Sequence, residues 1–218
     1  MDQQTGVIKA VLFDFDGTLV HLAVDWDRLR TRLQELFAPY GFESSFQPLL
    51  PCLEQARSHL LGSIRWSAVA DNVMVQAESI LREEELQGLN AAELVPGACE
   101  VLTRLTERGV PFAVVSNNHS GCIHAAFEKF ALPMPVVIIG REDVCRPKPD
   151  PGGIRKAIVA LGVASANCLL VSDGEQDCWA GTQAGALTAL LCPAANVSIF
   201  TSAPTFVLAE LRQLLALL

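Results

Sequence analysis

The pattern of apolar and polar positions changes twice along the chain, near residues 22 and 96. Residues 7–13 form a run of apolar and β-branched side chains, which is typical of a strand buried on both faces. From residue 96 onward, short apolar runs alternate with helical patterns that end at glycines. This alternation predicts an α/β fold, with a mainly parallel sheet and helices on both faces. The expected strands are residues 7–13, 111–116, 136–139, 168–171 and 187–191.

The expected helices of this second part fill the gaps between those strands. The last one is placed from about residue 206 to the terminus, because leucines recur there. The others are residues 96–109, a helix ending near 130, residues 153–161 and residues 178–184.

Residues 22–95 have a different pattern, with apolar positions at helical spacing and no convincing strand. One helix begins near residue 25, a second covers about 53–61 and a third about 67–86. Three helices directly after the first strand indicate a small all-helical insertion rather than a simple crossover. The expected division is therefore an α/β core of residues 1–21 and 96–218, with a helical subdomain of residues 22–95.

Composition narrows the class of protein. The 218 residues are enough for one sizeable core, and the net charge of −8 argues against a general nucleic-acid or anionic-membrane binder. Seven scattered cysteines without a Cys-x-x-Cys pair favour reduced thiols in a cytoplasmic protein. The uncharged stretch between Asp177 and Glu210 is broken by glycines and prolines, so it predicts helix, buried strand and loop rather than a membrane span.

Polar side chains follow several of the expected strands. Ligands in open α/β sheets bind beyond the carboxyl ends of the strands, so these side chains are expected to share one edge. Each group alone fits an ordinary polar turn, but together they supply carboxylates, hydroxyls, amides and one cation. The groups are Asp14, Asp16 and Thr18; Ser116, Asn117 and Asn118; Lys148; and Ser172, Asp173, Gly174, Glu175 and Asp177.

Such a set favours phosphoryl-transfer chemistry. Clustered carboxylates repel one another and are stable mainly around a hard cation, and an all-oxygen set suits Mg²⁺. A cation, a lysine and a hydroxyl can neutralise the oxygens of a transferring phosphoryl group. One aspartate can act as nucleophile, and another, two residues along, can donate and accept the proton.

Four motifs in order resemble those of the haloacid dehalogenase (HAD) superfamily. They are Asp14-Phe15-Asp16-Gly17-Thr18, Ser116-Asn117, Lys148, and Ser172-Asp173-Gly174-Glu175-Gln176-Asp177. The insertion resembles the small cap of phosphoglycolate phosphatase-like members. The resemblance implies a Rossmann-like core with a helical cap and a Mg²⁺-dependent phosphatase that acts through an aspartyl-phosphate.

The resemblance also implies roles for individual residues. Asp14 is expected to be the nucleophile and a metal ligand, and Asp16 the acid/base that binds metal through its backbone carbonyl. Asp173 completes the expected metal site, and Asp177 supports it from outside. The expected substrate-binding residues are Thr18, Ser116 and Asn117, with Lys148 as the catalytic cation.

Three positions depart from the usual pattern or leave a choice. The third motif fits Arg146 as well as Lys148, and the spacing that family members usually show between this lysine and the metal-binding aspartate favours Lys148, with Arg146 as a neighbouring surface cation. The fourth motif has Ser172 and Gly174 exchanged around an intact aspartate. His21 stands where many relatives have aspartate, as a hinge residue or as a group that touches the leaving group.

Other activities of the same superfamily remain as alternatives. Asp16 argues against a dehalogenase, and the lack of any lysine in residues 22–95 argues against a phosphonate hydrolase. A phosphosugar mutase and a catalytically silent binding protein stay open. The expected partner is a small phosphate ester such as phosphoglycolate, with the protein a monomer or homodimer. Arg57, His59, Arg65 and Trp66 are candidates to face the substrate from the second helix and the loop after it, but an ordinary helix-surface or cap-core position fits each of them better, so none is assigned a role.

Overall fold

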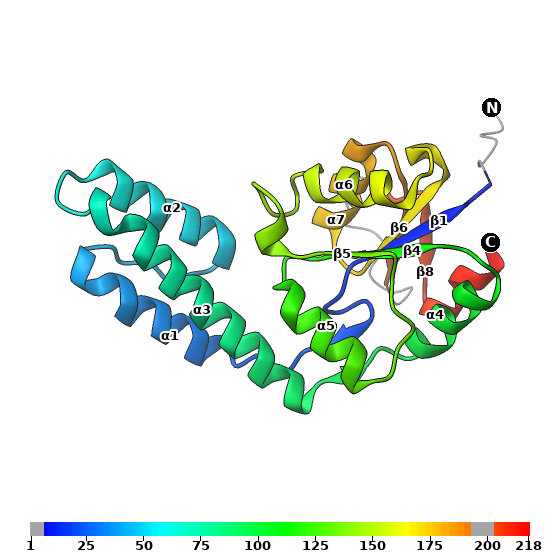
Figure 1. The fold of residues 1–218 in the computed structure, drawn as a ribbon, viewed down its shortest axis with the longest axis horizontal. Helices are drawn as coiled ribbons and strands as arrows, with labels where there is room; N and C mark the ends of the chain where they lie inside the picture. Colours follow the sequence, from blue (N-terminus) through cyan, green and yellow to red (C-terminus); the bar gives the residue numbers. More distant parts are fainter. Residues whose placement is uncertain (1–6, 193–202) are drawn as a thin grey trace. The chain divides into compact units, whose positions relative to one another are not determined.

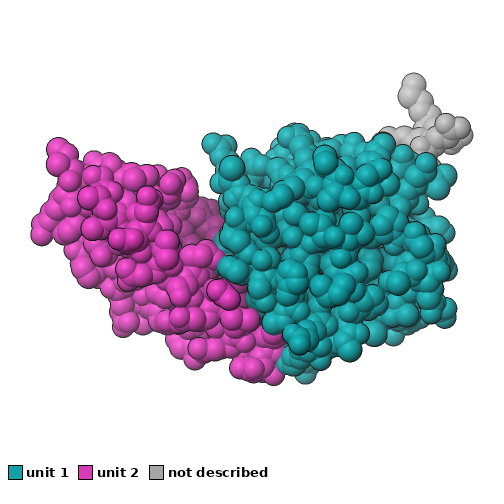
Figure 2. Space-filling view, viewed as in Figure 1, with its two compact units in different colours: residues 1–22, 92–218 teal, residues 23–91 magenta. Residues whose placement is uncertain are grey.

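The computed structural model describes residues 7–192 and 203–218, and these divide into two compact units. Residues 1–22 and 92–218 form the first, called the sheet unit below (Figure 2). Residues 23–91 form the second, called the helical unit. Their assignment as catalytic core and cap stays a prediction.

The sheet unit contains a six-stranded sheet in the order β5-β4-β1-β6-β7-β8, in which every neighbouring pair is parallel. This arrangement confirms the predicted α/β class. The central strands β1, β4 and β6 are buried along their whole length, as their apolar sequences predict. The strands are β1 Ala10–Phe13, β4 Phe112–Val115, β5 Val137–Ile139, β6 Cys168–Ser172, β7 Leu187–Leu191 and β8 Phe206–Leu208.

Helices cover both faces of this sheet. Figure 1 shows α6 (Gly152–Leu161) and α7 (Glu175–Ala184) on one side, with α4 (Ala98–Glu107) and α5 (Ser120–Lys129) on the other. The α6–α7 side forms a continuous apolar core, because alternate strand residues point toward it. Buried side chains of this core include Ala10, Leu12, Val115, Ile139, Ile154, Ile158, Leu170 and Ala180.

The helical unit contains the three predicted helices, α1 Trp26–Phe37, α2 Leu49–Gly62 and α3 Ala70–Gly88. The Asp25 carboxylate caps α1 by accepting the Arg28 amide hydrogen at 2.9 Å. Most of the predicted apolar positions are buried, but Trp26 is 44% exposed and Val69 is 36% exposed, while Leu36 and Ile80 are half-buried. The buried positions on α1 and α3 are Leu29, Leu33, Phe37, Val73, Ala77 and Leu81.

Two parts of the fold differ from the sequence-based expectation. Residues 206–208 form the edge strand β8 instead of starting a helix, and a 3-10 helix, η7 (Leu211–Ala216), follows. The strand forms because its backbone pairs in parallel with β7, which outweighs the local helical pattern. Glu93–Leu94 also form a short strand, β3, where none was expected, and β3 pairs antiparallel with β2 (Val20–His21).

No helix within the described residues is long and apolar enough to cross a membrane. The uncharged stretch after Asp177 forms most of α7 and then β7, as expected. Its predicted loop falls largely on residues 193–202, outside the described part of the chain.

A buried carboxylate joins α1 to α3 in the helical unit. Glu84 on α3 is 1% exposed and accepts hydrogen bonds from Arg28 and Arg32 on α1. Burial raises the pKa of the Glu84 carboxyl, but the bonds from both arginines outweigh it and keep the pKa below its ordinary value. The ionised carboxylate therefore stabilises the packing of these two helices.

We expect Glu84→Gln to lower the free energy of unfolding by about 1–3 kcal/mol, since a neutral amide turns a donor toward the arginines. The contribution of Glu84 should be present above about pH 4.5 and be lost as the pH falls further, because the folded-state pKa is depressed. Urea unfolding at pH 7 and pH 4 measures both effects. Glu83→Gln, which removes a half-exposed partner of Arg32, is the control and should change the midpoint little. Equal losses in the two variants would contradict the prediction.

Candidate active site

The carboxyl ends of three adjacent strands bring the predicted motifs together. Strands β4, β1 and β6 lie side by side and run in the same direction, so the residues that follow them share one edge of the sheet. Asp14 follows β1 directly, Ser116 follows β4, and Asp173 follows β6. The sheet topology therefore assembles side chains that lie far apart in the sequence.

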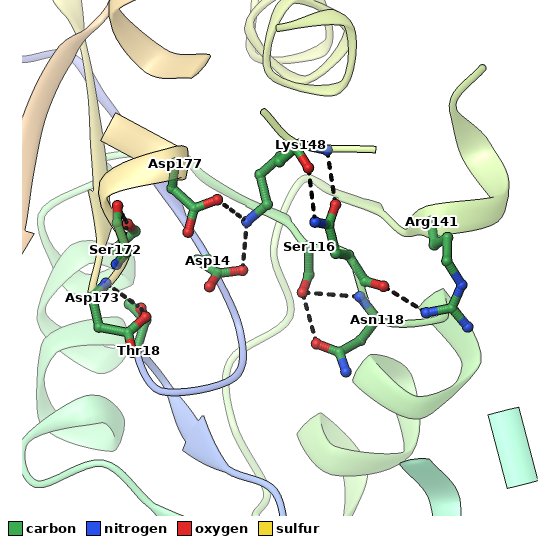
Figure 3. A network of polar contacts seen from close by, with 11 residues as sticks. Asp14, Thr18, Ser116, Asn118, Arg141, Lys148, Ser172, Asp173 and Asp177 are labelled. Atoms are coloured by element: carbon green, nitrogen blue, oxygen red, sulfur yellow. Dashed lines mark hydrogen bonds and ion pairs between the residues drawn. The ribbon is translucent and has the colours of Figure 1, made fainter. Parts of the chain in front are cut away.

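A buried ion-pair group forms the centre of this edge. The Lys148 ammonium donates to Asp14 Oδ1 and to Asp177 Oδ1, each at 2.7 Å, and all three side chains are buried (Figure 3). Burial lowers the pKa of Lys148, but the two carboxylates more than compensate and hold it above the ordinary lysine value. The ammonium is therefore charged and fixed between two acidic groups.

For Asp177, burial has a larger effect on the pKa of the side chain than the neighbouring charges have. Burial raises the pKa of its carboxyl, the Lys148 ammonium lowers it and the neighbouring Asp14 raises it, with a net value of about 6. The structure places Asp177 in direct contact with Lys148, and its predicted role as an outer support of the metal site stays a prediction. Arg146 is exposed, so Lys148 is the cation of the third motif that reaches Asp14.

The loop after β1 turns sharply at Gly17, which has φ +83°. A Cβ at this position would lie 2.1 Å from Asp173 Oδ2, so glycine is required both by the backbone conformation and by the close approach of that carboxylate. Asp16 Oδ1 accepts the Leu22 amide hydrogen at 2.9 Å. Burial is the largest of the effects that raise the pKa of Asp16 to about 6. The Leu22 hydrogen bond lowers this pKa, and the negative charges of Asp14 and Asp173 raise it. Its carboxyl can therefore hold or release a proton near neutral pH.

Thr18 holds Asp173 in place. The Thr18 hydroxyl accepts the Asp173 amide hydrogen at 3.1 Å and lies 3.3 Å from Asp173 Oδ1, to which it donates. Thr18 is fully buried and is not among the residues that line the pocket described below. Its predicted part in substrate binding stays a prediction.

The exchanged fourth motif forms a closed turn. The Ser172 hydroxyl accepts the Gly174 amide hydrogen at 3.1 Å and donates to the Gly174 carbonyl at 3.0 Å. A Cβ on Gly174 would lie 3.1 Å from Asp177 Oδ2, so the glycine leaves room for that carboxylate. Ser172 thus closes the turn, and Gly174 leaves room for Asp177, with Asp173 between them.

The second motif forms a compact loop after β4. The Ser116 hydroxyl donates to Asn118 Oδ1 at 2.9 Å and accepts the Asn118 amide hydrogen at 3.2 Å. The Asn117 side chain bonds the backbone of Lys148. The polar residues of this loop were predicted from the sequence. Their hydrogen-bond partners depend on tertiary contact, so no local sequence pattern predicts them.

A cavity of about 400 Å³ opens beside Asp14. Of the predicted site residues, Asp14, Ser116, Asn117, Lys148 and Asp177 line it, while Asp16, Thr18 and Asp173 do not. The sequence assigned no role to four other lining residues, although all of them lie next to the motifs. These four are Asn118, Gly174, Glu175 and Gln176.

Residues of the helical unit that had no assigned role make contacts within that unit. The Arg65 guanidinium stacks over the Trp66 ring at 4.2 Å, and Trp66 packs edge-on against Tyr40. His59 Nε2 bonds the Tyr40 carbonyl at 3.0 Å. His21, at the start of the insertion, is an exposed residue of β2, opposite Glu93 of β3.

The carboxylates at this edge fit a divalent cation. Asp14, Asp173 and Asp177 can each place one oxygen within 4.8 Å of the other two. An all-oxygen carboxylate set of this kind suits a hard cation such as Mg²⁺. The residues present are therefore compatible with the metal that the motifs imply.

The chain is similar to known hydrolases. The family model described as haloacid dehalogenase-like hydrolase matches residues 8–185. The chain belongs to this family. A phosphoglycolate phosphatase of Rhodospirillum rubrum is 31% identical over 185 residues, which cover 81% of this chain and 76% of that protein. Hexitol phosphatase A of Escherichia coli is 26% identical over 184 residues, 81% of this chain and 80% of that enzyme.

Solved structures show the same fold. The structure of CbbY from Rhodobacter sphaeroides in complex with phosphate has a TM-score of 0.63 at 20% identity, and the match covers 94% of this chain and 95% of that one. The predicted enzyme class, a HAD-type phosphatase, is thus confirmed by the family match and the curated relatives.

We expect Gly17→Ala to destabilise the protein by about 1–2 kcal/mol through the left-handed backbone and also to abolish turnover of p-nitrophenyl phosphate by displacing Asp173. Gly109→Ala is the matched control, because Gly109 has φ +65° with open space around it. The control should lose stability alone. Thermal unfolding and initial rates measure the two effects, and full activity of Gly17→Ala would contradict the proposed geometry.

Proposed function

We propose that this protein is a Mg²⁺-dependent phosphatase that hydrolyses a small phosphorylated metabolite through an aspartyl-phosphate intermediate. The observation that carries the proposal is the buried Asp14 carboxylate, which lines a cavity and accepts a hydrogen bond from the Lys148 ammonium, with the carboxylates of Asp173 and Asp177 close by. A nucleophile needs a fixed position, and a transferring phosphoryl group needs positive charge around its oxygens.

Asp14 attacks the phosphorus atom and takes the phosphoryl group from the substrate oxygen. Asp16 donates its proton to that leaving oxygen, so that an alcohol departs. Asp16 then accepts a proton from a water molecule that attacks the phosphorus of the aspartyl-phosphate. This second step releases inorganic phosphate and regenerates the Asp14 carboxylate.

The phosphate is held by Lys148, by the Ser116 hydroxyl and by the backbone of Asn117, which all lie on the cavity wall. Asp14, Asp173 and the backbone carbonyl of Asp16 would hold Mg²⁺, which when bound supplies positive charge to the phosphate oxygens. Asp177 supports the site through its bond to Lys148. Thr18 contributes by fixing Asp173.

A phosphoglycolate-like compound is the proposed substrate class. Curated relatives act, by name, on phosphoglycolate and on hexitol phosphates, all small phosphate monoesters. We assign the choice among such substrates to the helical unit in the role of a cap. The odd number of cysteines and the lack of a Cys-x-x-Cys pair support a cytoplasmic location.

The enzyme should release phosphate from p-nitrophenyl phosphate in the presence of Mg²⁺, and chelation with EDTA should remove this activity. Asp14→Asn should reduce turnover by at least about 10³-fold, because the amide cannot form the acyl phosphate. Phosphate release and circular dichroism together separate a lost nucleophile from a lost fold. Absence of turnover by the wild type against a broad panel of phosphate esters would refute the proposal.

Asp16→Ala should retain Mg²⁺ affinity, because the proposed ligand at this position is a backbone carbonyl, while turnover falls by about 10²–10⁴-fold. Calorimetric titration with Mg²⁺ and steady-state rates measure the two effects. Unchanged turnover would remove Asp16 from its acid/base role.

A further inference from the structure

The Asn117 side chain makes a two-point contact with the backbone of Lys148. Its Oδ1 accepts the Lys148 amide hydrogen at 2.9 Å, and its Nδ2 donates to the Lys148 carbonyl at 3.1 Å. Only a carboxamide offers a donor and an acceptor side by side for both backbone groups of one residue. The contact joins residues 31 positions apart in the sequence.

The same Lys148 carries the ammonium that bonds Asp14 and Asp177. A lysine side chain is a flexible chain of four carbons, so a fixed backbone is needed to fix the position of its ammonium. The Lys148 segment lies between η4 (Arg141–Asp143) and α6, outside any helix or strand, and lacks the support of a regular ladder. The Asn117 amide supplies that support.

Arg141 anchors the backbone of the loop that carries Asn117. The Arg141 guanidinium donates to the Asn117 carbonyl at 2.5 Å (Figure 3). The Arg141 amide donates to the Asn118 carbonyl at 3.0 Å. The amide side chain of Asn117 therefore projects from an anchored backbone. Because the Asn117 backbone is anchored, its side-chain amide can fix the position of the Lys148 backbone.

We propose that the Asn117 side chain is a positioning residue that fixes the Lys148 ammonium on Asp14 by clamping the Lys148 backbone. This role is separate from the phosphate contact proposed for the Asn117 backbone, and it rests on the proposed phosphatase function. The clamp links the second motif to the third, so the ammonium and the phosphate-binding loop keep one relative position.

The first test compares Asn117→Ala, which removes both bonds, with Asn117→Asp, which keeps the acceptor but not the donor. We expect kcat on p-nitrophenyl phosphate to fall by about tenfold or more in Asn117→Ala, and by at least as much in Asn117→Asp, because the second carboxylate oxygen would face the Lys148 carbonyl. Asn167→Ala is the matched control, because Asn167 also bonds a backbone carbonyl, that of Val7, at 2.8 Å. The control should keep the wild-type kcat and KM.

A double-mutant cycle separates positioning through Lys148 from a general structural role. In a Lys148→Met background, Asn117→Ala should cause little further loss, because the group it positions is absent. A kcat within twofold of wild type in Asn117→Ala, or an undiminished effect in the Lys148→Met background, would overturn the proposal. If Asn117→Ala does not fold, the same cycle with Asn117→Asp decides.

Chemical labelling tests the clamp without relying on turnover. Acetic anhydride should acetylate Lys148 several-fold faster in Asn117→Ala than in wild type, as measured by mass spectrometry, while the rate at Lys156 stays constant. An unchanged Lys148 rate would overturn the clamp even in an enzyme without measurable turnover. A wild-type protein that shows slow Lys148 labelling but no phosphatase activity would instead refute the proposed function alone.

Discussion

The buried ammonium of Lys148 is the charge on which the polar edge of the sheet depends. Asp14 and Asp177 lie in a poorly solvated position, where two carboxylates without a counter-charge would repel each other and lose hydration. One cation that bonds both of them at 2.7 Å offsets these costs. The same cation lies on the wall of the cavity, so the interaction that stabilises the acidic group also places positive charge beside that cavity.

The parallel sheet makes this interaction possible. The neighbouring strands β4, β1 and β6 present their carboxyl ends at one edge, and each contributes a different chemical group there. Fully buried central strands fix these positions, while the polar residues are confined to the loops that follow. The helical unit is inserted after the β1 loop, so the sheet keeps its order without interruption.

Hydrogen bonds and close contacts between neighbouring residues fix the conformation of each loop. Gly17 permits the approach of Asp173, Thr18 holds the Asp173 backbone, and Ser172 closes the turn of the fourth motif. The Asn117 amide joins the second and third motifs through the backbone of Lys148. The site is thus supported by residues beside the reacting groups as well as by those groups themselves.

The sequence by itself determined the α/β class, the helical insertion, most strands to within a few residues and the set of polar residues at the strand ends. These features are local, because they follow from apolar spacing and from residue types that sit next to one another. The choice of Lys148 over Arg146 followed from the spacing that is usual in the family that the motifs resemble.

Only the tertiary structure decided the contacts between distant segments. Residues 206–208 became a strand because β7 offers them a pairing edge, which no local pattern reveals. Thr18 proved to be buried against Asp173, and the Asn117 side chain to grip Lys148, because the fold brings these loops within hydrogen-bond distance. Hydrogen-bond partners across 31 or 155 residues depend on the path of the whole chain, so residue types at each end cannot specify them.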